Sequence, residues 1–153
     1  MKFLSILLLA MLLTACALAP PGTREGFKAG PGDAAETVPP PPGTSRAVIA
    51  LLEEARNAID AGDTVVAETK LERALRIEPR NAVLWHYMAR LRLAQDQPRR
   101  AAGLAARSNS LAPDNPRLQA INWRLIAEAR DRLGDRQGAR RAEAEAERLE
   151  AGR

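Results

Sequence analysis

The C-terminal two thirds of the sequence repeat with a period of 34 residues. Two similar phrases, at 77–81 and 111–115, each place a proline and then an asparagine, 34 residues apart. The spacing between Trp85 and Trp123 is 38 residues. Because four extra residues are close to one turn of helix, we expect a longer first helix in the third unit rather than a longer loop. A period of this length indicates a repeat protein, in which each unit buries its apolar face by stacking on its neighbours.

Turn-forming residues divide each unit into two helices. A glycine followed by an aspartate stands at 62–63 and at 134–135, which is typical of a helix end and the N-cap of the next helix. The segment 96–98, Asp-Gln-Pro, takes this place in the middle unit, and Asn81 and Asn115 can cap the helices that follow them. No stretch alternates with the period of a strand. The expected helices cover residues 46–61, 64–77, 82–95, 98–111, 116–133 and 136–150.

Residue size follows the same repeat. A bulky residue stands early in the first helix of each unit, at Leu51, Trp85 and Trp123. Small residues stand where helices must approach closely. They are Ala55, Ala89 and Ala127 in the first helices, and Ala67, Ala74, Ala101, Ser108, Ala139 and Ala146 in the second helices. This pattern resembles the tetratricopeptide repeat, a 34-residue helical hairpin. The resemblance implies an all-α fold of about three hairpins (48–81, 82–115 and 116–153) stacked as a short solenoid.

The N-terminus has the features of a lipoprotein signal. Lys2 precedes an apolar run, 4–13, that is too short to span a bilayer and has the length of a signal-peptide core. The phrase Leu-Thr-Ala-Cys at 13–16 resembles the lipobox of bacterial lipoproteins, in which the cysteine is acylated and becomes the mature N-terminus. We therefore expect a signal peptide at 1–15 and palmitate or a similar acyl chain on Cys16. The alternative is an ordinary buried cysteine.

The residue that follows the lipobox bears on the location of the protein. Ala17, in place of aspartate, favours the outer membrane by resemblance to the sorting rules of enteric bacteria. Several acyl chains would make retention there permanent, because each buried methylene contributes about 0.8 kcal/mol. We therefore expect a lipid-anchored protein that faces the periplasm.

A tether is expected between the anchor and the repeats. Residues 17–45 hold seven prolines and five glycines and show no apolar period. Such a composition is typical of disorder, with a short polyproline rod at 39–42. The segment would span roughly 30 Å on average and at most about 100 Å. We interpret the proline run as a spacer rather than as a ligand for an aromatic groove. The domain organisation is then 16–45 for the lipidated cysteine and tether, and 46–153 for the repeats.

Composition argues against catalysis and against nucleic-acid binding. With one cysteine and one histidine, neither a disulfide framework, nor a His-based metal centre, nor a Ser-His-Asp triad is expected. His86 has no nucleophile near it in the sequence and is expected on the surface or in a groove. The net charge of +4 comes from interleaved acidic and basic residues on a chain destined for export. We expect no enzyme activity, no cofactor, no metal and no small-molecule substrate.

A groove for a protein partner is expected on the concave side. The first helices of stacked hairpins line that side, which is the usual peptide groove of tetratricopeptide repeats. Counting along these helices away from the packing seam selects three residues from each unit. They are Leu52, Arg56 and Ile59; His86, Arg90 and Leu93; and Arg124, Glu128 and Asp131. Arginines beside leucines would suit an acidic segment. The alternative is that these are ordinary surface residues and that partners use the convex side or an end.

The layout of lipobox, proline-rich tether and small repeat domain resembles the lipoprotein activators of class A penicillin-binding proteins. That resemblance implies an adaptor that reaches across the periplasm and activates a peptidoglycan synthase. One alternative is a pilotin-like assembly factor for a secretin or a type IV pilus component. Another is a structural scaffold without a regulated partner. The long tether favours the activator.

Overall fold

The computed structural model describes residues 37–152. These residues form six α-helices and no strand, as the repeat pattern predicted. The helices are α1 (Arg46–Asp60), α2 (Thr64–Ile77), α3 (Ala82–Ala94), α4 (Pro98–Leu111), α5 (Pro116–Arg132) and α6 (Arg136–Ala151). None of these helices is long and apolar enough to cross a membrane. The predicted signal peptide at 1–15, Cys16 and the tether up to residue 36 lie outside the described residues.

Side-chain caps set the helix starts that the turn residues predicted. Asp63 and Asp135 accept hydrogen bonds from the backbone N–H groups of Val66 and Gly138, at 3.0 and 2.8 Å. Each therefore satisfies one of the N–H groups that a helix start leaves without an intrahelical partner. The asparagine caps work in the same way: Asn115 accepts from the N–H of Leu118 at 3.0 Å.

The turn inside the middle hairpin uses a different residue from the other two. The turns at Gly62 and Gly134 have positive φ angles of 75° and 79°, which glycine adopts without strain. Asp96 takes this place in the middle hairpin, with a φ angle of 55°. Aspartate tolerates the left-handed region better than most residues. The proline at 98 then begins α4 at a position that needs no backbone donor.

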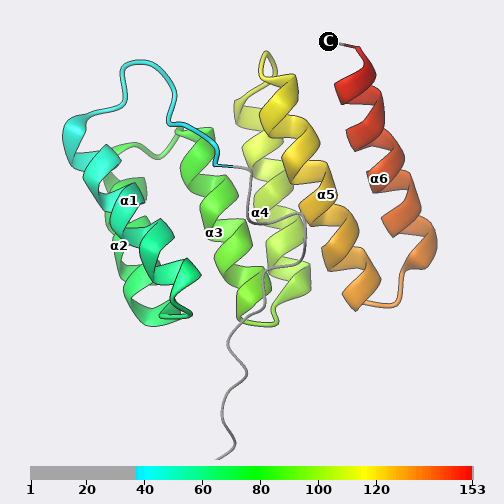
Figure 1. The fold of residues 1–153 in the computed structure, drawn as a ribbon, viewed down its shortest axis with the longest axis horizontal. Coiled ribbons are helices and arrows are strands. Elements are labelled where there is room, and N and C mark those ends of the chain that lie inside the picture. Colours follow the sequence, from blue (N-terminus) through cyan, green and yellow to red (C-terminus); the bar gives the residue numbers. More distant parts are fainter. Residues whose placement is uncertain (1–36, 153) are drawn as a thin grey trace, which may run out of the picture.

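The six helices form three antiparallel hairpins that lie side by side (Figure 1). Each helix contacts the next one along the chain, and α3 also contacts both α1 and α5. The first helices of the hairpins, α1, α3 and α5, therefore form one layer, and α2, α4 and α6 pack behind it. This is the two-layer arrangement that stacked hairpins of a solenoid require.

Most of the small residues lie in the packing seams, as predicted, whereas Ala139 is only half-buried and lines the hollow between α5 and α6. Ala55, Ala67, Ala89 and Ala101 are fully buried. In the middle unit Ser108 replaces an alanine and is also fully buried, and its hydroxyl donates to the carbonyl oxygen of Ala82 at 2.8 Å. A small side chain at each position lets neighbouring helix backbones approach closely.

Candidate protein-binding surfaces

The nine residues predicted for a concave groove do not form one surface. Four of them are buried, with exposed fractions of 4% or less. They are Leu52, Ile59, His86 and Leu93. His86 bonds to Asn122 of α5, and Leu93 packs in one cluster with Leu125 and Ile126 of the same helix. These positions therefore face the following hairpin rather than a partner.

The equivalent positions of α5 have no following hairpin among the described residues. Arg124, Glu128 and Asp131 line a shallow hollow between α5 and α6, away from the other predicted residues. Arg124 forms an ion pair with Glu150 at 2.6 Å and lies 3.8 Å from Glu143. Polar residues at this end are what a solenoid needs on a face that no further repeat covers.

His86 belongs to a buried hydrogen-bond chain and not to the surface, which corrects the sequence prediction. Its Nδ1 lies 2.8 Å from Oδ1 of Asn122, and the Asn122 amide donates to Ser108 and to Asn109, both at 2.8 Å. Because the amide oxygen only accepts, the imidazole carries its proton on Nδ1. Ser108 in turn donates to a carbonyl oxygen at the start of α3. The chain joins α3, α4 and α5.

The remaining imidazole nitrogen of His86 is buried without a hydrogen-bond partner among the described residues. Protonation there would place a positive charge in the core. Burial therefore lowers the pKa of His86 from 6.5 to about 4; the bond to Asn122 opposes this shift and the charge of Arg90 adds to it. The histidine is a neutral structural residue at pH 7.

Arg56 and Arg90 are the predicted residues that the structure brings together. Their guanidinium groups lie 5.8 and 5.6 Å from the ring centroid of Tyr87, within cation–π range. Tyr87 itself is fully buried. The sequence analysis did not select Tyr87, although Arg90 follows it by three residues in the same helix.

The end of the predicted tether covers part of the layer formed by α1, α3 and α5, which we call the concave layer. Val38 is buried in the cluster that contains Tyr87, Leu118 and Ile121, so it touches the layer of first helices. Its N–H donates to the Tyr87 hydroxyl at 3.4 Å. Figure 1 shows the segment before α1 turning back and running across α3.

We call residues 37–40 the strap. A second bond fixes it, since Arg56 donates to the hydroxyl of Thr37 at 2.9 Å. The turn between strap and α1 is held by the Ser45 N–H, which donates to Glu78 at 2.9 Å. The sequence analysis placed residues 37–45 in a disordered tether, whereas the structure buries Val38 in the domain and ties Thr37, Thr44 and Ser45 to it by hydrogen bonds. One valine among prolines has no periodicity, which is why its burial was missed.

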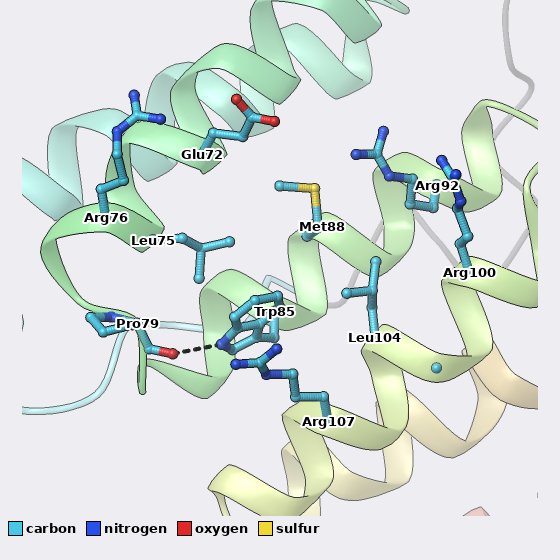
Figure 2. A pocket seen from close by; sticks show the side chains of 11 residues that line it. Glu72, Leu75, Arg76, Pro79, Trp85, Met88, Arg92, Arg100, Leu104 and Arg107 are labelled. Carbon is cyan, nitrogen blue, oxygen red and sulfur yellow. Dashed lines mark hydrogen bonds between the residues drawn. The ribbon is translucent and has the colours of Figure 1, made fainter.

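A different surface of the domain, away from the strap, is open to solvent. A cleft of about 960 Å³ lies between α2, α3 and α4. Its lining combines apolar side chains with four arginines, and Figure 2 shows these side chains converging from the three helices. They are Leu75, Pro79, Trp85, Met88 and Leu104, and Arg76, Arg92, Arg100 and Arg107, together with Glu72 and Gly103. A volume of this size is in the range of ligand and peptide pockets.

Two contacts fix the shape of this cleft. The Trp85 indole N–H donates to the carbonyl oxygen of Pro79 at 2.8 Å, which holds the ring in place (Figure 2). The Arg107 guanidinium lies 3.7 Å from the centroid of that ring. Cation–π contact therefore orders Arg107 at the rim.

Arg92 closes the cleft between α2 and α3. It forms an ion pair with Glu68 at 2.6 Å, and Gln95 donates to the other oxygen of the same carboxylate at 3.1 Å. The hydrogen bond from Arg92 is the main reason that the pKa of Glu68 is lowered. Arg92 is therefore neutralised inside the domain, unlike the other three arginines of the cleft.

Within residues 37–152, no three His, Cys, Asp or Glu side chains come together as a metal site. The open surface offers apolar contact and positive charge, which are the means by which a domain binds another protein.

Comparisons with known proteins agree with this geometry. A family model described as "Tetratricopeptide repeat" matches residues 58–125. A solved structure, the globular C-terminal domain of LpoP from P. aeruginosa, is 40% identical in sequence and superposes with a TM-score of 0.65. The match covers 67% of this chain and 97% of the LpoP domain. A search of curated proteins finds no match.

Proposed function

We propose that this chain, which belongs to the tetratricopeptide-repeat family together with the LpoP globular domain, is an outer-membrane lipoprotein. In this proposal the lipoprotein activates a class A penicillin-binding protein. The domain itself is a non-enzymatic protein-binding module.

The observation that carries the proposal is the 40% identity over 97% of the LpoP domain. A shared fold alone does not identify a function, because one fold serves many binding partners. The identity to the LpoP domain also agrees with the resemblance to lipoprotein activators that the lipobox and the proline-rich segment suggested from the sequence.

The packing of the strap on the domain shortens the length of chain that can act as a tether. With residues 37–45 packed on the domain, twenty residues, 17–36, separate Cys16 from the strap. A chain of that length extends to at most about 70 Å, compared with about 100 Å for the whole of 17–45. The domain must therefore meet its synthase within this distance of the outer membrane, or release the strap to go further.

Shortening the tether tests the trans-periplasmic role. Deleting residues 22–36 leaves the strap in place and reduces the stretched limit to about 18 Å. Synthase stimulation in cell envelopes should then fall to the level of a strain without the lipoprotein, because a tether that cannot span the gap contributes no effective concentration. A Gly/Ser segment of equal length at 22–36 should restore it.

The same experiment separates the activator from an assembly factor. A pilotin-like protein acts at the outer membrane and would tolerate the shortened tether. Full synthase stimulation by a stably expressed, lipidated protein lacking 22–36 would contradict the activator proposal.

A further inference from the structure

We propose that the cleft between α2, α3 and α4 is the docking site for an acidic segment of the partner protein that also carries a bulky apolar side chain. This inference rests on the proposed function for the existence of a protein partner. It adds the surface that binds the partner and the chemistry of the bound segment.

The apolar floor accounts for the bulky side chain. Leu75 and Met88 lie between Arg76 on one side and Arg92 and Arg100 on the other, and Leu104 and the Trp85 ring extend this apolar surface (Figure 2). Leu75, Leu104 and Trp85 are half-buried, so part of each faces the cleft. Covering such apolar area with a bulky apolar side chain favours binding.

The charge of the rim accounts for the acidic segment. Arg76, Arg100 and Arg107 are exposed, and within the described part of the chain none of them forms an ion pair with a carboxylate. Among the described residues that line the cleft, Glu72 is the one carboxylate, against four arginines. Guanidinium groups prefer carboxylates, which they bind through two parallel hydrogen bonds.

Among the described residues, the arginines of the concave layer are already engaged within the domain. Arg56 and Arg90 are directed to Tyr87, and the strap covers the ring. A partner would first have to displace Val38 from the core cluster. The cleft needs no such displacement.

The shape of the cleft favours a peptide over a membrane surface. The apolar side chains lie at the floor, between helices, and the arginines stand at the rim. A protruding side chain of a folded partner can enter this hollow, whereas a flat bilayer surface contacts the rim alone.

Photo-crosslinking from inside the cleft tests the occupant. Gly103 lines the cleft, and a Cβ atom built there meets nothing within 4 Å, so the photo-reactive amino acid p-benzoylphenylalanine fits at this position. Ala144, exposed on α6, is the matched control position. The full chain is expressed in cells, irradiated and purified, and the crosslinked peptide is sequenced.

We expect crosslinks from position 103, and not from position 144, to a segment of the synthase that contains Asp or Glu beside a bulky apolar residue. Reversing the charge at Arg76 and Arg100 to Glu should weaken this crosslink at least tenfold. Reversing Arg136 and Arg141 of α6 changes the net charge equally, lies outside the cleft, and should leave the crosslink unchanged. Equal melting temperatures of the two double variants confirm that both fold.

Three outcomes would overturn the inference. One is a crosslink to lipid alone, another is a crosslink to a basic or uncharged segment, and the third is partner contact only from positions on the concave layer. The failure of the proposed function looks different: the wild-type chain would then fail to stimulate the synthase, while position 103 could still trap an acidic segment of another protein.

Discussion

The concave layer and the cleft use arginine in opposite ways. On the concave layer, Arg56 and Arg90 are turned to Tyr87, and Arg56 also holds the strap through Thr37. In the cleft, Arg76 and Arg100 stand at the rim without a carboxylate partner in the described residues. On the first surface both arginines face a buried ring of the domain, whereas Arg76 and Arg100 of the cleft are available to a carboxylate of a partner.

The two surfaces should therefore respond differently to substitution, one in stability and the other in binding. Residues of the concave layer and of the seam beneath it are buried and bonded to one another, so changing them should lower the free energy of unfolding. Arg76, Arg100 and Arg107 at the rim of the cleft are exposed, so changing them should affect binding and leave stability nearly unchanged. The predictions below test this division, beginning with the largest expected effect.

The buried hydrogen-bond chain should be the most sensitive point. Asn122→Leu removes the partner of the His86 Nδ1–H and the bonds to Ser108 and Asn109. We expect a loss of about 4 kcal/mol in the free energy of unfolding, because a buried donor without a partner costs about 1–3 kcal/mol on top of the lost bonds. Urea denaturation measures it. The exposed Asn57→Leu is the control, and equal midpoints for the two variants would contradict this account.

Acid should lower the free energy of unfolding through protonation of His86. The unfolded chain binds a proton at His86 with a pKa of 6.5, whereas the folded chain does so only near pH 4. Stability should therefore be complete above pH 6.5 and fall by about 3 kcal/mol as the pH decreases to 4. Urea denaturation as a function of pH shows this slope, and His86→Gln should remove it. A slope between pH 6.5 and 4.5 that is the same in both proteins would show that His86 is not its cause.

The strap should contribute less than the seam. Val38→Ala removes two methyl groups from a side chain that is 3% exposed, so we expect a loss of about 2 kcal/mol. Val65→Ala changes a side chain that is 74% exposed and should have almost no effect. If thermal unfolding gave the two variants the same stability, the packing of the strap on the concave layer would be ruled out.

Two glycines in second helices provide the smallest test. Gly103→Ala adds a methyl group to the open cleft and should stabilise the domain by about 0.5–1 kcal/mol through helix propensity. Gly138→Ala should instead destabilise it by about 1 kcal/mol, because the new Cβ would collide with the Asp135 side chain that caps α6. Melting temperatures that shift in the same direction for both variants would contradict the local geometry.

The sequence predicted the helices well because their ends are set locally. Each turn signal, such as the glycine and aspartate at 62–63, acts on its own few residues, and the repeat period supplied the pairing into hairpins. The expected helix bounds therefore agree with the observed ones to within one residue.

The binding surface was harder to predict because it depends on which way each helix faces. Counting along the first helices selected positions such as Leu52 and Leu93, which face the next hairpin and are buried. Because Leu52 and Leu93 are apolar, their burial in the packing seam between hairpins could have been predicted from the sequence. The cleft joins arginines from three helices, Arg76, Arg92 and Arg100 among them, and nothing in the local sequence connects them.

The central claim is that the open cleft, and not the strapped concave layer, holds the partner. The most direct measurement is the dissociation constant of the full mature chain for the purified synthase, compared between Gly103→Glu and Val38→Ala. Gly103→Glu places a carboxylate inside the cleft, while a Cβ at this position meets no neighbour. The account predicts binding at least tenfold weaker for Gly103→Glu, with Gly103→Ala and Val38→Ala close to wild type. If Val38→Ala weakened binding and Gly103→Glu left it unchanged, the cleft would not be the surface that holds the partner.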